Sequence, residues 1–488
     1  MQEEEKRITK IFVGGEWKTS LSSVTHPVFN PSTGQVISMI PYSTKEEVDE
    51  ATGSAHEAFQ KWKTLPIGER VKYLFRMKDA FERHFEELAA LNSENHGKTM
   101  VESRGDVRRT IDNIDAAIGV GYTLAKGEAM DQIASGIDES SVKEPLGVFG
   151  IICPFNFPLM IPFWFIPYAL VLGDTLVVKP SEITPLPMDK AMRIIEEEVR
   201  LPPGVLNMFH GSREVSEELI RDEKIRGVAF VGSTPVARNV YRLAGEHGKR
   251  ALVNGGAKNP IVIMPDADLD LAVSASTSSF FGNAGQRCLA GANFITVGTI
   301  HDSALGKLKE SALRLKVGGA LDPDTEMGPV VSQSAKKRII GKIGEGMEEG
   351  AKAVLDGRTI SIREYPEGFY LGPTILDGVT YDMDIAKQEI FGPVASAISC
   401  DTLDGAIDLI NRGTEYGNMA SIFTSSGRAA REFRRGVDAG NIGINIGVAS
   451  PAANFPFGGR KQSFFGMLHA QIDTVGFFTD SKVVISRW

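Results

Sequence analysis

Hydrophobic and polar positions follow a helical period through much of the chain before Gly147. Between Lys45 and Asn95 the stretches AHEAFQKWKTL and YLFRMKDAFERHFEEL are amphipathic, with apolar residues at helical spacing. Residues Glu102–Ala117 predict a further, more polar helix, and Thr9–Glu16 (TKIFVGGE) is typical of a short hairpin. We therefore expect this part of the chain to be mainly helical.

From Gly147 onward, short apolar runs typical of strands alternate with helical segments. A first series comprises LGVFGII, TLVVKP, GVLNMFHG, RGVAFVG, ALVNGG and PIVIMP, and a second comprises FITVG, SAISC, ASIFTSS and NIGINIG. This alternation predicts parallel βαβ units. Because 488 residues are too many for one hydrophobic core, we expect two α/β domains, although no repeat or linker marks their boundary.

The apolar run Ile151–Leu172 is long enough to cross a bilayer and nearly uncharged. Four prolines interrupt it, however, and each would leave backbone groups unpaired in lipid. We therefore expect a buried strand, a loop and a core helix here, and no membrane association. The prolines are Pro154, Pro158, Pro162 and Pro167.

Composition narrows the class of protein. Hydrophobic residues make up 42% and charged residues 24%, as in ordinary globular proteins, and the net charge of −9 disfavours nucleic-acid binding. The N-terminal MQEEEKRITK lacks the apolar segment of a secretory signal. Three cysteines, Cys153, Cys288 and Cys400, form no disulfide framework, and no Cys/His cluster has zinc-site spacing. These features predict a cytoplasmic protein without a bound metal.

Cys288 is the first candidate for chemistry, within Asn283–Ala292 (NAGQRCLAGA). A thiol becomes a nucleophile when its thiolate is stabilised, and the polar, glycine-rich loop with Arg287 favours that role. The alternative is a small buried hydrophobe, the commoner fate of a free cysteine. Cys153 and Cys400, within apolar runs, match that alternative better.

Two strand ends carry candidate ligand-binding residues. In FVGSTPV, Gly232 and Ser233 connect an apparent strand to a helix start, where a phosphate could bind, although a plain βα turn accounts for the pattern equally well. In VVKPSE, Lys179 and Glu182 follow a strand and could contact a ribose. A surface turn stiffened by Pro180 is the alternative, and on these residues alone the favoured one.

Eight motifs in fixed order resemble the aldehyde dehydrogenase superfamily: GQRC, PFNFP, KPSE, FVGSTPV, GAKNP, MGPV, EIFGPV and FPFGGRKQSFFG. The resemblance runs from about Asn30 to the C-terminus. Arginine before the cysteine, ICPFNFP, GAKN and the tail GINIGV…FPFGGRKQSFFGMLHA are most similar to the CoA-acylating methylmalonate-semialdehyde dehydrogenase branch.

The resemblance implies roles for individual residues. Cys288 would attack the aldehyde, and Asn156 with the backbone N–H of Cys288 would stabilise the oxyanion. Hydride would then pass to NAD, leaving a thioester on the cysteine. The implied cofactor residues are Phe155, Lys179 and Glu182, Gly232 and Ser233, and Glu389 and Phe391; the carboxylate of Glu182 would favour NAD over NADP.

Asn254 departs from the hydrolytic members of the superfamily. They carry a glutamate in an E-L-G-G-K motif that activates water, whereas this chain has VNGGAKNP with Asn254 at that position. An amide lacks basicity near neutral pH, while a thiol supplies some thiolate without a strong base. CoA is therefore the expected acyl acceptor, although another base could still serve water.

Two arginines would hold a substrate carboxylate in this branch, and Arg109 and Arg287 match them. For Arg109 a solvated helix face is the competing interpretation, since Arg104 and Arg108 lie close by. The implied reaction is NAD-dependent oxidation of malonate or methylmalonate semialdehyde, with decarboxylation and release of acetyl-CoA or propionyl-CoA.

Three alternatives to this reaction remain. The first is a hydrolytic NAD(P)-dependent aldehyde or semialdehyde dehydrogenase, acting for example on succinate semialdehyde or glyceraldehyde. The second is a catalytically silent member of the family. The third is a cysteine hydrolase, but the eight histidines propose no partner for the thiol.

The implied fold class is α/β, with a Rossmann-like NAD-binding domain, an α/β catalytic domain and a small β oligomerisation element. The expected divisions are 1–123 with 143–253, 254–465, and 124–142 with 466–488, respectively. The alternating, apolar tail KVVISRW exposes a strand edge that a partner should cover. The resemblance implies a homodimer or homotetramer.

Overall fold

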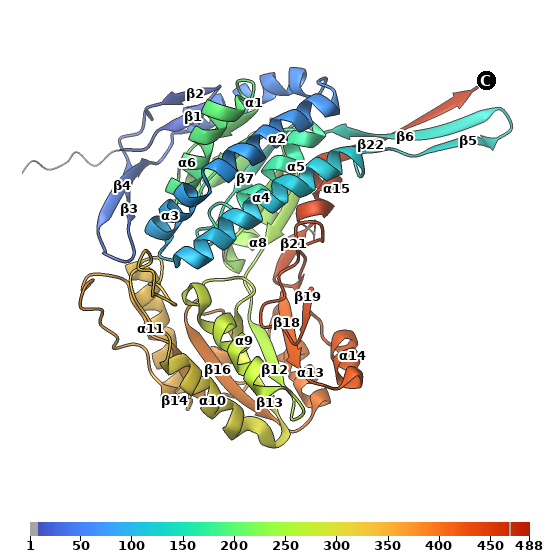
Figure 1. Ribbon diagram of the computed structural model, residues 1–488. Coiled ribbons are helices and arrows are strands. Elements are labelled where there is room, and N and C mark those ends of the chain that lie inside the picture. The colour runs from blue at the N-terminus through green and yellow to red at the C-terminus, as the bar shows by residue number, and fades with distance from the viewer. Residues whose placement is uncertain (1–7, 468–469) are drawn as a thin grey trace, which may run out of the picture.

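A computed structural model describes residues 8–467 and 470–488. The first seven residues of MQEEEKRITK, and Leu468 and His469 of the tail motif, lie outside the described residues. Figure 1 shows two units, each built on a sheet, stacked one above the other, with a long β arm projecting from the upper one.

The sheet of the upper unit contains most of the first predicted strand series. Its central strands β9, β8, β7, β10 and β11 are parallel neighbours. The order is β2 (Glu16–Lys18), β1 (Ile11–Val13), β9 (Leu206–Met208), β8 (Thr175–Lys179), β7 (Val148–Ile152), β10 (Ile225–Val231), β11 (Arg250–Asn254) and β21 (Phe464–Gly466).

Helices cover both faces of this sheet and bury apolar residues against it (Figure 1). The predicted helical region 45–95 is three helices, the first of which begins with a capping box between Thr44 and Glu47. The helices are α1 (Lys45–Trp62), α2 (Ile67–Arg83), α3 (Phe85–His96), α4 (Met100–Tyr122), α5 (Ile166–Leu172), α6 (Leu186–Ile194), α7 (Arg213–Arg221) and α8 (Thr234–Glu246).

The second sheet contains the later strand series around its own core. Apart from the antiparallel edge strand β14, neighbouring strands are parallel. The order is β14 (Lys352–Leu355), β15 (Thr374–Asp377), β16 (Val394–Cys400), β13 (Gly291–Val297), β12 (Asn259–Ile263), β18 (Met419–Phe423) and β19 (Asn441–Ile444). Its helices are α9 (Leu269–Phe281), α10 (His301–Leu313), α11 (Gln333–Glu348), α12 (Asp384–Lys387), α13 (Leu403–Gly413) and α14 (Gly427–Gly436).

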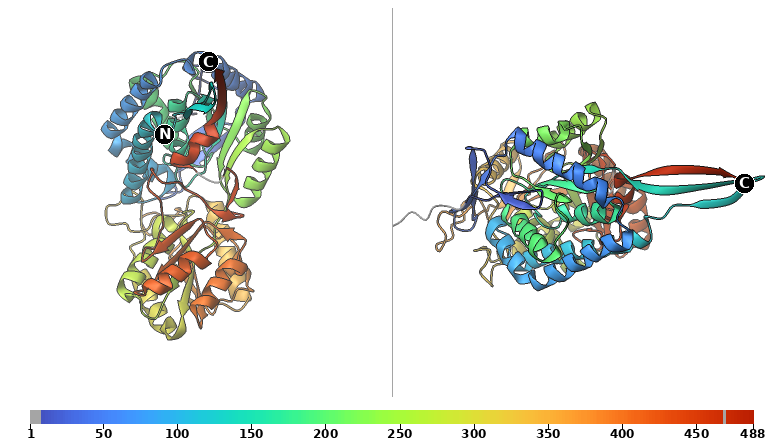
Figure 2. Two further views of the ribbon diagram at one scale, coloured as in Figure 1. Left: turned by 90° about the vertical axis from the view of Figure 1, so that its right-hand side faces the viewer. Right: turned by 90° about the horizontal axis from the view of Figure 1, so that it is seen from above.

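The arm is a small antiparallel sheet that joins segments distant in sequence. The C-terminal strand β22 (Thr479–Arg487) pairs along its length with β6 (Ile137–Pro145), which pairs with β5 (Ala129–Ala134). The right-hand view in Figure 2 shows the arm extending away from the body of the molecule. The sequence predicted the C-terminal strand, and the structure supplies its partners.

The remaining elements are short. The antiparallel pair β3 (Thr25–Phe29) and β4 (Val36–Pro41) forms a hairpin, and β17 (Tyr416–Gly417) pairs with β20 (Arg460–Lys461). Single helical turns are η1 (Pro162–Trp164), η2 (Ile195–Val199), η3 (Gly282–Gly285), η4 (Gly298–Ile300), η5 (Gln471–Thr474) and α15 (Val475–Phe478).

The apolar run Ile151–Leu172 is confirmed as core. It forms the end of β7, a loop, the turn η1 and helix α5, and the helix residues are all buried. None of the helices in the described ranges is long and apolar enough to cross a bilayer.

Two connections position the candidate site between the sheets. Residues 255–258 carry the chain from the end of β11 in the first sheet to the start of β12 in the second. Residues 282–290 connect α9 to β13 and contain Cys288. The strand β21, of which Phe464 and Phe465 fall within the range 254–465 that the sequence assigns to the catalytic domain, pairs with β11. The domain division itself stays a prediction.

Candidate active site

The loop before Cys288 has an unusual backbone. Asn283, Ala284 and Gly285 have φ angles of 55°, 49° and 72°, in the left-handed region. A Cβ on Gly285 would lie 2.0 Å from the carbonyl oxygen of Gly392, so only glycine is accommodated. Three successive left-handed residues turn the chain sharply between α9 and Cys288.

Two asparagine side chains fix the carbonyl group of Cys288. Nδ2 of Asn259 and Nδ2 of Asn418 each donate a hydrogen bond of 2.8 Å to this oxygen. Asn259 begins β12 and Asn418 precedes β18, two adjacent strands of the second sheet. The cysteine is therefore attached to the strand ends of that sheet while its loop faces the first unit.

Asn156 comes to this loop from the first unit. Its side chain is buried, and Nδ2 donates to the carbonyl oxygen of Gln286 at 3.2 Å. Its own carbonyl oxygen accepts from Nζ of Lys98 at 2.8 Å, and Lys98 forms an ion pair of 2.9 Å with Asp106. The structure thus brings the predicted oxyanion donor within two residues of the predicted nucleophile.

The thiol of Cys288 is in its neutral form in this arrangement. Part of Cys288 is exposed to solvent, but protein atoms surround its thiol. This burial is the main cause that raises the pKa of the thiol to about 12. The negative charge of Glu389 adds to the rise. The backbone N–H groups of Cys288 and Leu289 and the charge of Arg287 act in the opposite direction. Formation of the thiolate therefore requires a proton acceptor.

The other two cysteines differ from Cys288. Cys153 is buried in the core as predicted, and burial raises the pKa of its thiol to about 12. Cys400 is only half-buried, because β16 ends there, and its Sγ lies 3.3 Å from the carbonyl oxygen of Thr402. Neither lies in a loop shared by the two units.

Glu389 and Phe391 lie in the segment between α12 and β16. Oε1 of Glu389 accepts a hydrogen bond of 2.8 Å from the backbone N–H of Ala257. Phe391 has a φ of 53°, and its ring meets the edge of Phe155 at a centroid distance of 5.7 Å. Phe155 in turn stacks on His96. Two predicted cofactor residues from different units, Phe155 and Phe391, are therefore in contact.

Lys179 and Glu182 lie at the carboxyl end of β8. Nζ of Lys179 donates to the carbonyl oxygens of Pro180 at 3.0 Å and Gly211 at 2.9 Å, and lies 3.3 Å from Oε2 of Glu182. Burial alone would raise the pKa of Glu182, but the charge of Lys179 and hydrogen bonds outweigh it, so the pKa lies below its usual value. A cavity of about 650 Å³ reaches Glu182 from the side of the β3–β4 hairpin.

Gly232 and Ser233 connect β10 to α8. A Cβ on Gly232 would lie 2.5 Å from the ring of Phe230. Ser233 is the N-cap of α8, and in the described part of the chain its side chain makes no capping hydrogen bond, so the N–H groups of the first turn, to which Pro235 contributes none, are not capped by it. This helix start suits a phosphate, and Glu182, which follows β8 at the same carboxyl edge of the parallel strands, suits ribose hydroxyls, so these residue types fit a dinucleotide.

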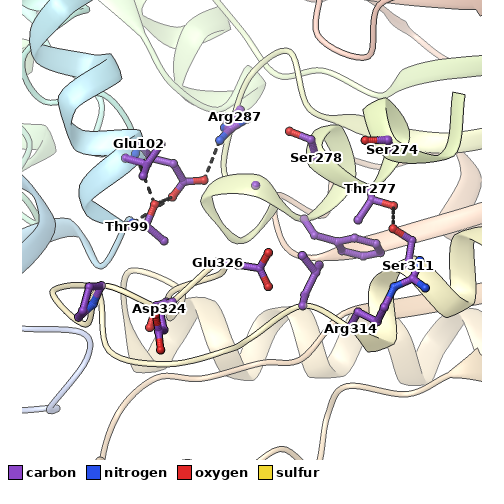
Figure 3. Close-up of a pocket in the computed structure, with 16 residues that line it drawn as sticks. Thr99, Glu102, Ser274, Thr277, Ser278, Arg287, Ser311, Arg314, Asp324 and Glu326 are labelled. Atoms are coloured by element: carbon purple, nitrogen blue, oxygen red, sulfur yellow. Dashed lines mark hydrogen bonds and ion pairs between the residues drawn. The ribbon is translucent and has the colours of Figure 1, made fainter. Parts of the chain in front are cut away.

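Arg287 is already engaged with another side chain. Its Nη2 forms an ion pair of 2.7 Å with Oε1 of Glu102, the residue that completes the capping box of α4 with Thr99. Figure 3 shows Arg287 and Glu102 pointing toward each other beside a cavity of about 640 Å³. Arg287, rather than Cys288, lines this cavity.

Arg109 lies on the same helix as Glu102 but contacts a different segment. Its guanidinium donates to the carbonyl oxygen of Pro451 at 3.2 Å and to Oγ of Ser450 at 3.2 Å. The neighbouring Arg104 and Arg108 instead pair with glutamates on exposed helix surfaces. Arg109 and Glu102 are seven residues apart, or about 10 Å along the helix. Arg109 and Arg287 therefore both lie along one face of α4 without sharing a partner.

Sequence reasoning left two residues of this region without a role. Lys258 lies in the GAKNP motif, and the structure buries its side chain. Glu102 could have been found from its spacing, because Thr99 and Glu102 have the T-x-x-E pattern of a capping box.

Asn254 is buried at the end of β11, and among the described residues its side-chain oxygen and nitrogen have no hydrogen-bond partner.

Comparison with known proteins covers nearly the whole chain. The family described as "Aldehyde dehydrogenase family" matches residues 17–484. A relative from Geobacillus kaustophilus (strain HTA426), named malonate-semialdehyde dehydrogenase 1, is 44% identical over 485 residues, which are 99% of this chain and 98% of that protein.

Solved structures agree over a similar span. A Sinorhizobium meliloti 1021 protein, provisionally named methylmalonate-semialdehyde dehydrogenase and crystallised with NAD, is 36% identical, with a TM-score of 0.97 over 100% of this chain and 99% of that one. Methylmalonate-semialdehyde dehydrogenase from Oceanimonas doudoroffii is 38% identical, with a TM-score of 0.96 over 99% and 98% of the two chains.

Proposed function

Because this chain belongs to the aldehyde dehydrogenase family, we propose that it oxidises malonate or methylmalonate semialdehyde with NAD and transfers the acyl product to CoA. The observation that carries the proposal is the hydrogen bond from Asn156 to Gln286, which holds an amide donor at the loop of the Cys288 thiol. The names of the relatives support the substrate class.

Cys288 is the proposed nucleophile. Its Sγ bonds to the aldehyde carbon, the thiol loses its proton, and the carbonyl oxygen becomes an oxyanion. Nδ2 of Asn156 has two N–H donors, of which one is used by Gln286, so the second can stabilise the oxyanion together with the backbone N–H of Cys288.

NAD, when bound, supplies a hydride acceptor, so that the oxidised product remains on Cys288 as a thioester. Lys179 and Glu182 would hold the adenosine ribose, and Gly232 and Ser233 the pyrophosphate. The carboxylate of Glu182 would repel the additional phosphate of NADP, which favours NAD. Glu389, Phe391 and Phe155 would hold and orient the nicotinamide half.

Release of the acyl group is proposed to use CoA. Asn254 cannot act as a base toward water, so hydrolysis of the thioester is slow. The carbon–carbon bond to the substrate carboxylate breaks, carbon dioxide leaves, and the adjacent carbon takes up a proton. The thiol of CoA then attacks the thioester, the acyl group passes to CoA, and Cys288 regains its proton.

Arg109 and Arg287 are the proposed contacts for the substrate carboxylate. Each guanidinium has several N–H donors, and the hydrogen bonds described above leave some of them for a ligand. Glu102 holds Arg287 through one nitrogen and so orients the guanidinium without occupying all its donors.

The assembly and location of the protein are proposed on the same basis. The arm strands would be covered by another copy of the chain, giving a homodimer or homotetramer in the cytoplasm. Exposed apolar side chains on the arm support this assembly: Met130, Ile133, Val483, Ile485 and Trp488. In this proposal residues 1–123 with 143–253 bind NAD, 254–465 carry catalysis, and 124–142 with 466–488 join the subunits.

A substrate panel tests the proposed function. Malonate, methylmalonate and succinate semialdehydes and an uncharged aldehyde are assayed with NAD, with and without CoA, on wild type, Arg109→Ala and the surface control Arg108→Ala. We expect turnover of malonic-type semialdehydes to require CoA. Arg109→Ala should raise KM for them at least about tenfold, as expected from loss of a charged hydrogen bond, while sparing the uncharged aldehyde.

Two results would oppose the proposal. Full steady-state turnover without CoA would favour the hydrolytic alternative. Equal losses for charged and uncharged aldehydes in Arg109→Ala would remove the arginine contact from the account.

A further inference from the structure

Lys258 is a buried lysine in the segment that joins the two sheets. It is 2% exposed, and within residues 8–467 and 470–488 its Nζ has no hydrogen-bond partner. An ammonium group removed from water without a hydrogen bond is costly and needs a compensating charge. If this position served only to fill the interior, an apolar side chain would be sufficient.

The residues on either side of Lys258 contact the candidate site. The backbone N–H of Ala257 donates to Oε1 of Glu389, and Nδ2 of Asn259 donates to the carbonyl oxygen of Cys288. A Cβ on Gly256 would lie 2.5 Å from Oε2 of Glu389, so the carboxylate packs directly on this segment. One short backbone segment therefore contacts Glu389, carries Lys258 and is hydrogen-bonded to the Cys288 loop.

The charges around Glu389 come from several elements. Lys258 and Arg338 of α11 act as cations toward it, and Arg338 also donates to the carbonyl oxygen of Ile390. Tyr416 and Cys288 are the acidic groups on which the charge of Glu389 acts. Lys258 is buried, and the negative charge of Glu389 acts on it.

Both members of the Lys258–Glu389 pair are shifted toward neutrality. Burial is the main cause that lowers the pKa of Lys258 to about 7, and the charge of Glu389 opposes it. Burial likewise raises the pKa of Glu389 to about 7, against the hydrogen bond from Ala257 and the charges of Arg338 and Lys258. A carboxylate with such a pKa can accept and release a proton near neutral pH.

We propose that Lys258 is a positioning residue whose buried ammonium group keeps Glu389 ionised, so that Glu389 takes up the proton that leaves the thiol of Cys288. The S–H bond breaks, the proton moves to the Glu389 carboxylate, and the electron pair stays on sulfur. When Glu389 takes up the proton, it loses the negative charge that disfavours the Cys288 thiolate. The thiol and the carboxyl group therefore carry one negative charge between them. The inference rests on the proposed function only in taking Cys288 as the reacting atom.

The direction of the pH effect follows from the charges. The cation of Lys258 lowers the pKa of Glu389, so removing it raises that pKa and keeps Glu389 protonated to higher pH. A protonated Glu389 cannot accept the thiol proton. The pH at which Cys288 becomes reactive should therefore move upward when Lys258 loses its charge.

Alkylation of Cys288 by iodoacetamide, followed by mass spectrometry of its peptide, tests the proposal without aldehyde or CoA. Rates are measured from about pH 5 to about pH 10 for wild type, Lys258→Met, Lys258→Arg and Glu389→Gln. Wild type should show an inflection at about 7, from Glu389. Lys258→Met should shift it upward by more than Lys258→Arg does, and Glu389→Gln should abolish it.

Lys249→Met is the control, since Lys249 is half-buried but donates to the backbone carbonyls of Asp222 and Ile225 at the start of β10. Its inflection should equal that of wild type, and circular dichroism checks that each variant is folded. The same inflection in wild type and Lys258→Met, or an inflection that survives in Glu389→Gln, would overturn the proposal. The measurement on Glu389→Gln tests the proposal even if the Lys258→Met variant does not fold. An alkylation profile as expected, with no semialdehyde oxidation, would leave this inference standing and reject the proposed function.

Discussion

Asn254 is buried at the end of β11, where hydrolytic relatives are expected to carry a carboxylate. The side chain has the shape of a short carboxylate but no basicity, so it fills the position without activating water. We therefore propose that Asn254, which lacks a basic carboxylate, is what excludes water as the acyl acceptor.

Asn254→Glu should create CoA-independent turnover. A carboxylate at this position can take a proton from water, and general bases typically contribute about 100-fold or more to such a step. The measurement is steady-state NADH formation without CoA, with Asn254→Gln as the control of equal length. No gain in the glutamate variant, or the same gain in the glutamine variant, would mean that a missing base is not what excludes water.

Lys98 and Asp106 form a fully buried ion pair that also supports Asn156. Lys98→Met should destabilise the protein by about 3–5 kcal/mol, because Asp106 then loses its buried cation. Lys78→Met, which breaks an exposed pair with Asp115, should cost less than about 1 kcal/mol. Urea unfolding of both variants gives the comparison, and equal losses would contradict this assignment.

At the residue scale, sequence motifs name the candidate site residues but not the contacts that these residues make. Cys288, Asn156 and Glu389 could be named because motifs carry them, and the structure places Asn156 at the cysteine loop and Glu389 on the neighbouring segment. The partner of Arg287 could not be predicted, because Glu102 is 185 positions away. The burial of Lys258 could not be predicted either, since lysine is normally a surface residue.

At the scale of elements, the start of α8 is the proposed binding site for the pyrophosphate of the cofactor. Gly232 packs against the ring of Phe230, and the N–H groups of the first helical turn follow. This turn joins a parallel strand to a helix, the local geometry that orients backbone donors toward one point.

Gly232→Ala should weaken NAD binding by about tenfold or more, because its Cβ would meet the ring of Phe230 at 2.5 Å and displace the turn. The dissociation constant is measured by quenching of protein fluorescence. Gly245→Ala on the same helix is the control, since its Cβ meets nothing within 4 Å. Unchanged affinity in Gly232→Ala would remove the turn from the cofactor site.

Elements with strong periodicity were predictable and irregular ones were not. The two strand series and the C-terminal strand are confirmed, because apolar runs between turns reflect burial in a sheet. Helix α4 is longer than the polar helix predicted at Glu102–Ala117, since its buried face mixes small and polar residues with aliphatic ones. The β3–β4 hairpin and the placement of β21 depend on packing against distant segments.

For the whole molecule, the aldehyde dehydrogenase-like α/β fold predicted from ordered motifs is confirmed. The arrangement in which the two sheets face each other across residues 255–258 and 282–290 could not be derived from periodicity. It depends on contacts between the units, such as the hydrogen bond from Asn156 of the first unit to the carbonyl oxygen of Gln286 in the Cys288 loop.

The arm should mediate assembly. Val483 and Ile485 are 61% and 66% exposed, so apolar surface is left uncovered in a single chain. The double variant Val483→Lys with Ile485→Lys should reduce the oligomer measured by light scattering to smaller species. Leu21→Lys, at a 78% exposed position on the body, is the control. An oligomer unchanged by the arm substitutions would place the interface elsewhere.

The most direct test of the account is mass spectrometry of the intact protein after mixing with NAD and methylmalonate semialdehyde in the absence of CoA. We predict an added propionyl group on Cys288, absent in Cys288→Ser, which disappears as propionyl-CoA forms when CoA is added. No acyl group on Cys288, or one that CoA does not remove, would contradict the account.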